Sequence, residues 1–368
     1  MALRPPSLRR GPVRVVLART TLLSLTTSWR AAALALVELG GIALFASGVA
    51  ERVLGESGAW FVLMAVGVSL ALRAVDLESC ALFVRRGLRG EVEQTLGPKA
   101  AATAVAVQLA DHLLLGTLAA VVVGHYVALP LLSVLGEGPL RRQAAGDLST
   151  AVAVALVGFL WWWQRQGRSF SVRIVTTAVS IAVAPLALTI VWALASSVAG
   201  GHLSRFALPS SPIGLLSTVL ASRHVPGAIW QPVAFLTALG YCLCVLGSGE
   251  ALAHVAPELR QPRIRQLQWT ARPVGLYALL VTAGVGFLVV AIVPAEVRAA
   301  WLDAPVAALA LNVRAPLALR LFLLLSVVVA AVLLLAATLH RAAVSAQGLL
   351  SRLSEDGVLA PALRTLHT

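Results

Sequence analysis

Long runs without Asp, Glu, Lys or Arg are the feature that most limits what this chain can fold into. One such run extends over 174–199 and another over 321–340. About 20 apolar residues in succession allow an α-helix to cross the hydrocarbon core of a bilayer. Only 12% of the 368 residues are charged and 59% are hydrophobic, whereas soluble domains carry about 25% charged residues. The sequence therefore predicts an all-α, polytopic integral membrane protein and excludes soluble, disordered and coiled-coil classes.

The apolar runs predict about eight transmembrane helices. The expected spans are 31–50, 58–72, 100–135, 148–164, 174–199, 231–249, 274–293 and 321–340. Four of them contain or adjoin the charged residues that are considered below.

The distribution of basic residues predicts the orientation. Twenty of the 29 Arg and Lys residues lie in the N-terminal arm, the C-terminal tail and the alternate loops on the same side, and eight lie in the opposite loops. By the positive-inside rule, both termini are cytoplasmic and the protein is a multi-pass protein of the inner (plasma) membrane. The basic residues are interleaved with apolar runs, which indicates contact with membrane lipid and not with nucleic acid. We expect the arm at 1–30 to be retained, either as an interfacial amphipathic helix or as a disordered basic segment.

Several enzymatic classes are excluded by the absence of their motifs. A P-loop needs a Lys followed by Ser or Thr, but the only lysine, Lys99, is followed by Ala100. Neither a His-Glu-x-x-His zinc motif nor a Gly-x-Ser-x-Gly elbow occurs. His112 and His125 lie about 140° apart around one helix, which favours polar packing or pore lining over haem ligation. We expect no enzymatic activity, cofactor or metal, and no disulfide among the three cysteines Cys80, Cys242 and Cys244.

The segment between the second and third spans has a helical pattern of its own. Leu88, Val92 and Leu96 recur every four residues, and Gly97 and Pro98 end the pattern. This predicts a short amphipathic helix over 85–96 at the cytoplasmic surface. The alternative is a solvated turn that only joins two membrane helices.

The run from 89 to 96, followed by Pro98, resembles the cytoplasmic loop of ABC-2 type ABC transporter permeases. The Arg-rich turn at 165–173 and the Ser-Pro segment at 211–216 are also similar to that family. The resemblance implies an exporter subunit that works with a separate P-loop ATPase, as a homodimer or heterodimer of permease subunits. It also implies that the helix docks on the ATPase through Arg85, Arg86, Arg89, Glu91, Glu93 and Gln94.

The resemblance implies a division of the chain into parts. After the arm at 1–30 comes a six-span permease-like domain at 31–256. A cytoplasmic linker follows at 257–272, then two additional transmembrane helices within 273–340, and a cytoplasmic tail at 341–368. The two additional helices depart from the pattern of the family.

Charged residues in or beside the spans are candidate functional groups: Glu38, Arg73, Asp76, Asp111 and Glu250. An unpaired charge at mid-depth costs ~2.5–3.5 kcal/mol on insertion scales, so each needs compensation. Arg73 and Asp76 are three residues apart on one helix face, which favours a structural salt bridge over a substrate site. Glu38 and Asp111 either line a path or pair with a neighbouring helix.

These observations lead to an ATP-driven exporter subunit as the expected function. The alternatives are a secondary transporter that uses Glu38, Asp111 and Glu250 for proton coupling, a membrane scaffold or assembly factor, and, least favoured, an intramembrane enzyme. No repeat of one half in the other supports the secondary transporter from sequence. The substrate is not indicated by any charge cluster or aromatic cage.

Overall fold

The computed structural model of the chain describes residues 28–82, 87–133, 139–166, 172–200, 230–246 and 263–355. These ranges consist of helices joined by short turns, and no β-strand occurs within them. The prediction of an all-α, polytopic membrane protein is confirmed. The basic arm at 1–27 and the segments around Glu250 and at 211–216 lie outside the described residues.

Each of the eight predicted stretches forms a helix. The corresponding helices are α2 (Ser28–Leu54), α3 (Gly58–Leu82), α5 (Pro98–Ser133), α6 (Pro139–Arg165), α7 (Val172–Ala199), α9 (Trp230–Leu246), α11 with α12 (Arg263–Tyr277 and Val285–Ile292), and α15 (Leu317–Glu355). Six helical segments of the described chain are long and apolar enough to cross a membrane, and the first of them, Trp29–Val75, covers most of α2 and α3. The 17-residue α9 is a shorter apolar helix.

Glycine and proline determine two of the helix boundaries. Gly55 has a φ of 63°, and there α2 gives way to the short helix η1 (Gly55–Ser57) before α3 begins. Gly97 has a φ of 90° and separates α4 (Gly87–Leu96) from α5, whose first residue is Pro98. A left-handed glycine after one helix and a proline at the first position of the next are the residues that these sites favour.

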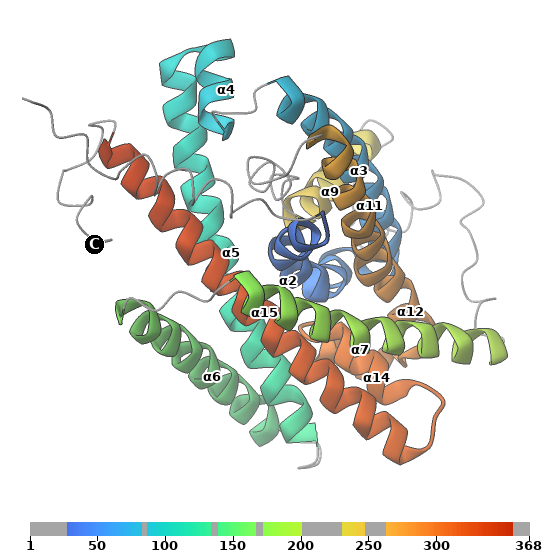
Figure 1. Cartoon of the computed structure of the whole chain (residues 1–368). Coiled ribbons are helices and arrows are strands. Elements are labelled where there is room, and N and C mark those ends of the chain that lie inside the picture. The colour runs from blue at the N-terminus through green and yellow to red at the C-terminus, as the bar shows by residue number, and fades with distance from the viewer. Residues whose placement is uncertain are drawn as a thin grey trace, which may run out of the picture.

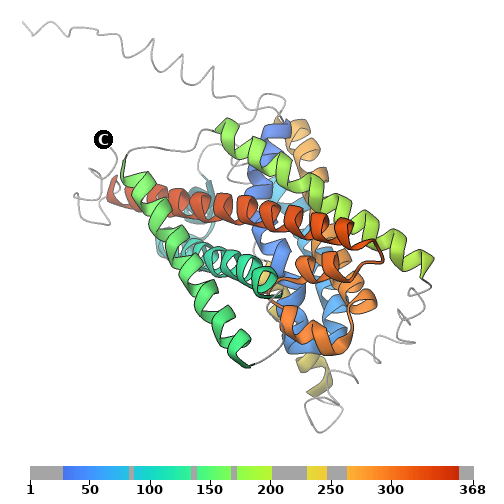
Figure 2. The same ribbon diagram turned by 90° about the horizontal axis from the view of Figure 1, so that it is seen from below.

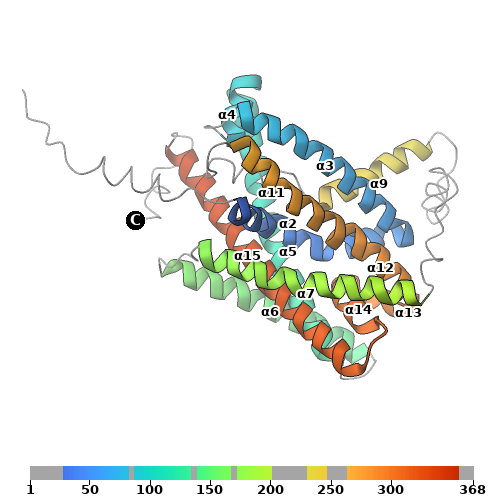
Figure 3. The same ribbon diagram turned by 45° about the vertical axis from the view of Figure 1, so that its right-hand side comes forward.

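Helix α2 lies at the centre of the bundle. Figure 1 shows it with α3, α9 and α11 on one side and with α15, α7 and α14 on the other. Between Ala31 and Ala46 most of its residues are buried, including Ala35, Val37 and Leu44 at 0% exposure. In Figure 3, α3 lies between α11 and α9, next to this central helix. An apolar helix that is covered on all sides is typical of a core helix in a membrane bundle.

The long helix α15 packs against α5, α7, α14 and the central helix α2. In Figure 2 it crosses the bundle with α5 and α6 along one side and α7 on the other. It extends to Glu355, well beyond the expected end of the last span at 340. Likewise, α11 begins at Arg263, so the residues expected to form the end of a linker before 273 are helical.

The segment between α12 and α15 differs from the external loop that the sequence predicts. It contains α13 (Ala295–Arg298), η5 (Ala299–Trp301) and the eight-residue helix α14 (Pro305–Asn312). Val306, Ala307 and Leu309 of α14 are at 0% exposure, and the helix packs against α2, α7, α12 and α15. The helix α14 is too short to cross a membrane and lies buried inside the protein.

Candidate functional site

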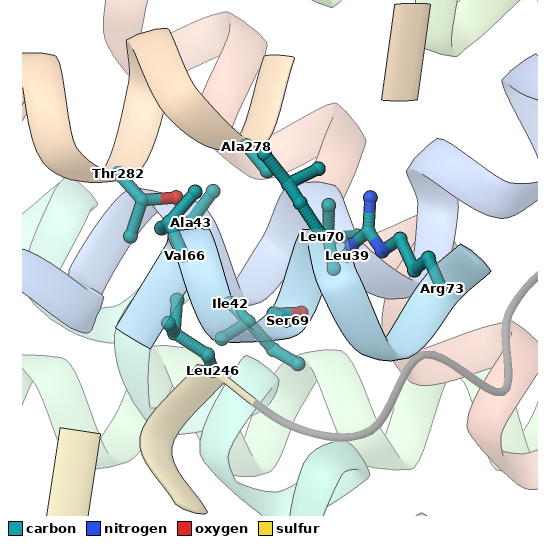
Figure 4. A pocket seen from close by; sticks show the side chains of 10 residues that line it. All are labelled: Leu39, Ile42, Ala43, Val66, Ser69, Leu70, Arg73, Leu246, Ala278 and Thr282. Carbon is teal, nitrogen blue, oxygen red and sulfur yellow. The ribbon is translucent and has the colours of Figure 1, made fainter. Parts of the chain in front are cut away.

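A pocket lies in the middle of the bundle, where α2, α3, α9 and the π-helical segment η4 (Ala278–Gly284) meet. The space between these elements, about 290 Å³ in all, includes open solvent at the mouth, so the enclosed part is much smaller. Figure 4 shows the ten side chains that line it. Seven are aliphatic, namely Leu39, Ile42, Ala43, Val66, Leu70, Leu246 and Ala278, and three are polar, namely Ser69, Arg73 and Thr282. A concave, mostly apolar site with a few polar groups is the usual form of a small-molecule site.

Helical periodicity brings the lining residues to one side of each helix. Val66, Ser69, Leu70 and Arg73 occupy positions i, i+3, i+4 and i+7 of α3, which share one helix face. On α2, the residues at 39, 42 and 43 follow the same rule. The sequence therefore predicts which residues share a face of each helix, but it does not predict which helix faces pack together.

Arg73 is the only charged residue among the described residues that line the pocket. It is buried, at 5% exposure, within a membrane helix. The sequence predicted a salt bridge to Asp76, whose side chain lies outside the described residues, so that pairing stays a prediction. The structure adds that Arg73 belongs to a cavity, which spacing along one helix could not reveal.

The segment η4 is a π-helix between two α-helices, and it supplies Ala278 and Thr282 to the pocket. Single-turn π-helical insertions in α-helices occur frequently at functional sites. Thr282 is at 1% exposure. The residue before the segment, Tyr277, donates a hydrogen bond from its hydroxyl to the Gly40 carbonyl of α2, at 3.3 Å.

Hydroxyl groups from three helices donate to backbone carbonyls of α2. Besides Tyr277 of α11, Tyr126 of α5 donates to the Leu44 carbonyl at 2.8 Å. Thr338 of α15 donates to the Val37 carbonyl. These bonds bracket the residues of α2 that line the pocket, so they fix the backbone of that wall against its neighbours.

A pair of glycines lets α15 approach α2 closely. A Cβ built on Gly40 would lie 2.9 Å from Leu334 Cδ2, and one built on Gly41 would lie 2.5 Å from Thr338 Oγ1. Both distances are shorter than ordinary contacts, so a Cβ at either position would displace the side chain of Leu334 or Thr338.

Glu38 pairs with a neighbouring helix, one of the two possibilities that the sequence left open. Its Oε1 accepts a hydrogen bond from Arg341 Nε of α15 at 3.4 Å, and the two side chains are 15% and 26% exposed. Next to this pair, His340 Nδ1 lies 3.2 Å from Gln164 Nε2 of α6, and Gln347 Nε2 donates to Gln164 Oε1 at 3.3 Å. Glu38 thus belongs to a polar layer that joins α2, α15 and α6.

Asp111 is exposed on α5. Asp111 is not among the residues that line the pocket.

The remaining sequence candidates are not part of the pocket. His112 is buried and His125 half-buried on α5, and within the described residues no three His, Cys, Asp or Glu side chains gather as a metal site would require. Cys242 is buried and Cys244 is exposed, and both are free thiols.

An ion-pair cluster closes the bundle where α2 turns into α3. Arg298 is buried at 8% side-chain exposure and lies 2.6 Å from both Glu51 and Glu56. Arg52 and Asp303, at 2.7 Å, complete the cluster. A second contact seals the same end, because a Cβ on Gly48 would lie 1.8 Å from the Leu302 carbonyl oxygen.

Residues 87–96 of the predicted amphipathic segment form a helix, α4 (Gly87–Leu96), which packs against α5. Among the residues predicted to dock on an ATPase, Glu93 and Gln94 are exposed. Arg85 and Arg86 lie outside the described residues, as do the side chains of Arg89 and Glu91. Leu96, expected to seat the helix on the membrane domain, is 75% exposed because it is at the very end of the helix.

These features define a multi-pass helical membrane protein with a small pocket at the middle of its central helix. The chain matches the sequence model of the family described as amino acid permease over residues 27–367, and it therefore belongs to that family. No curated protein sequence matches the chain.

Family membership overturns the resemblance to ABC-2 exporters. That resemblance was based on short, degenerate motifs, whereas the amino acid permease match covers nearly the whole chain. The expectations that came with it, an ATP-driven exporter, a P-loop ATPase partner and a docking role for α4, were wrong. The family points instead to secondary transport, which was the first alternative.

Proposed function

We propose that this chain is a secondary transporter that moves a small, amino-acid-like solute across the cell membrane through the pocket between α2, α3, α9 and η4. The family supports the solute class. The observation that carries the proposal is the pocket itself, which combines aliphatic walls with a buried Arg73 in the middle of an apolar bundle.

The closed end of the bundle supports a transport cycle with two access states. Between the pocket and the ion-pair cluster, α2 is covered by other elements, with Leu44, Ala46 and Ala50 at 0% exposure. From Ala43 to Glu51 this barrier is about 12 Å thick at 1.5 Å per residue. A solute can leave through this end only if α2 separates from the segment that carries Arg298 and Leu302.

We further propose that both termini are cytoplasmic, because 20 of the 29 basic residues lie on that side. The ion-pair cluster then faces the outside. In this orientation the structure represents a state closed to the exterior. ATP hydrolysis is not expected of the chain, since Lys99 is not followed by Ser or Thr.

Substrate protection of a cysteine in the pocket tests the proposed site. Ser69→Cys is introduced into a variant in which Cys80, Cys242 and Cys244 are replaced by Ala, and its alkylation by N-ethylmaleimide is measured in membranes. A mixture of amino acids should slow alkylation several-fold, because a bound solute covers the thiol. Lys99→Cys, exposed at the start of α5, is the control and should react at an unchanged rate. Equal rates at Ser69→Cys with and without amino acids would refute the site.

A further inference from the structure

The polar side chains of the pocket, Ser69, Arg73 and Thr282, lie along its length. Figure 4 shows Thr282 and Arg73 at opposite ends, with Ser69 between them, and the Arg73 side chain running back towards Leu39 and Leu70. The guanidinium is thus directed along the cavity. At 5% exposure, it is held inside the bundle by its surroundings.

We propose that Arg73 binds the carboxylate of the transported solute, so that the chain selects small aliphatic amino acids and rejects amines that lack a carboxylate. This inference rests on the proposed function and adds the substrate class and the residue that recognises it.

The chemistry of a guanidinium supports this assignment. Its five N–H donors lie in a planar fork that matches the two oxygens of a carboxylate. With five donors, the Arg73 guanidinium can bind a neighbouring group of the protein and a substrate carboxylate at the same time. A buried cation is costly in a membrane bundle and such residues commonly mark a substrate path. At the pocket, a carboxylate that arrives with the solute meets a positive charge in a low-dielectric setting, where the attraction is strong.

The rest of the lining fits the other parts of a small amino acid. The described lining contains no Asp or Glu, so an ammonium group has hydroxyl oxygens, those of Ser69 and Thr282, as its side-chain acceptors. An aliphatic side chain would contact Ile42 and Val66. A diamine would bring a second positive charge towards Arg73 and find no carboxylate.

Three ligands that differ by one group test the inference on the unaltered protein. Valine, isobutylamine and 3-methylbutanoate share a branched carbon chain, and they carry both charged groups, only the amine and only the carboxylate, respectively. Binding is measured as the thermal stabilisation of the purified protein in detergent, since a ligand that binds the folded state raises the unfolding temperature. We expect valine to bind about 10–100-fold more tightly than isobutylamine, because charge-assisted hydrogen bonds to the carboxylate are lost. Putrescine should not bind.

Variants of Arg73 test whether this residue causes the preference for valine over isobutylamine. Arg73→Gln should abolish the difference between valine and isobutylamine, and Arg73→Lys should keep part of it, because Lys retains the charge without the fork. Arg272→Gln is the matched control: Arg272 is exposed, lies over Trp269 at 5.2 Å and does not line the pocket. It should bind valine like the unaltered protein.

The outcomes separate the inference from the proposed function. If isobutylamine or putrescine binds as tightly as valine, the pocket accepts solutes but Arg73 does not select carboxylates, and only the inference fails. If Arg73→Gln folds and still prefers valine, the carboxylate is bound elsewhere, and the inference also fails. If no member of the panel binds and no amino acid is transported, the proposed function fails and the inference with it. Because the ligand panel uses the unaltered protein, an Arg73 variant that does not fold leaves the test intact.

Discussion

At the residue scale, the charged side chains of this chain differ in how deeply they are enclosed. Arg298 is 8% exposed between Glu51, which is 11% exposed, and Glu56, which is 69% exposed. Arg52, the residue after Glu51, is 53% exposed and pairs with Asp303. Exposed pairs contribute about 0–1 kcal/mol, whereas removing one member of a buried pair leaves an uncompensated charge. The two arginines should therefore respond differently to mutation.

Arg298→Met should lower the free energy of unfolding by roughly 3–5 kcal/mol, because it leaves the Glu51 carboxylate buried without its partner. Arg52→Met should lower it by at most about 1 kcal/mol. Thermal unfolding of the purified proteins in the same detergent measures both. Equal losses in the two variants would show that the cluster does not depend on the burial of Arg298.

The pair of Glu38 and Arg341 gives a second comparison. Glu38→Gln and Arg341→Gln should each destabilise, and the double variant should lose less than the sum of the two, with a coupling energy of about 1 kcal/mol for a partly exposed pair. Unfolding of the four proteins forms a double-mutant cycle. A coupling energy of zero would mean that the 3.4 Å contact does not contribute to stability.

At the element scale, α2 determines the arrangement of its neighbours. Three glycines, Gly40, Gly41 and Gly48, allow α15 and the segment before α14 to reach its backbone. Hydroxyls of Tyr126, Tyr277 and Thr338 then bind its carbonyls. The same helix supplies one wall of the pocket, so its packing and the shape of the site are linked.

Gly48→Ala should reduce the yield of folded protein and destabilise it by about 1–3 kcal/mol, as overpacking does. The cause is the carbonyl oxygen of Leu302, 1.8 Å from the added Cβ. Gly67→Ala is the control, because a Cβ there meets nothing within 4 Å, and alanine in a helix interior stabilises by up to about 1 kcal/mol. Fluorescence-detected size-exclusion chromatography with thermal challenge compares the two. A Gly48→Ala protein as stable as the unaltered one would contradict the packing described at the end of α2.

The sequence predicted the helices well and the contacts between them poorly. Apolar run length is a local property, so all eight stretches were found, and Gly97 with Pro98 correctly indicated a break between two helices. The partner of Glu38, in contrast, is 303 residues away, and no spacing rule connects the two. The sequence identified Arg73 as a charged residue beside a predicted span. It could not show that Arg73 lines a pocket, because the other walls of that pocket come from α2, α9 and η4. The buried α14 was missed because eight residues are too few to span a membrane.

At the scale of the whole molecule, the central helix α2 has α3, α9 and α11 on one side and α15, α7 and α14 on the other (Figure 1). The pocket lies on the side of α3, α9 and η4, and the polar layer with Glu38, Arg341 and Gln164 lies on the side of α15 and α6. The ion-pair cluster closes one end. A solute can cross such a bundle only if the groups of helices change their relative positions.

The orientation can be tested independently of transport. A green fluorescent protein fused after Thr368 should fluoresce, and an alkaline phosphatase fused there should be inactive, because the charge distribution places the C-terminus in the cytoplasm. Fusions at 134–138, between α5 and α6, should give the opposite pair of results. An active phosphatase at the C-terminus would reverse the orientation and place the ion-pair cluster on the cytoplasmic side.

Transport by the purified chain alone, reconstituted into liposomes without nucleotide, tests the central claim most directly. With a proton or sodium gradient imposed across the membrane, radiolabelled small aliphatic amino acids should accumulate inside above the level in empty liposomes. Dissipating the gradient with an ionophore should abolish the accumulation, and ATP should have no effect. If neither gradient drives uptake, although the protein is folded and the liposomes are tight, the account of this chain as a secondary transporter is contradicted.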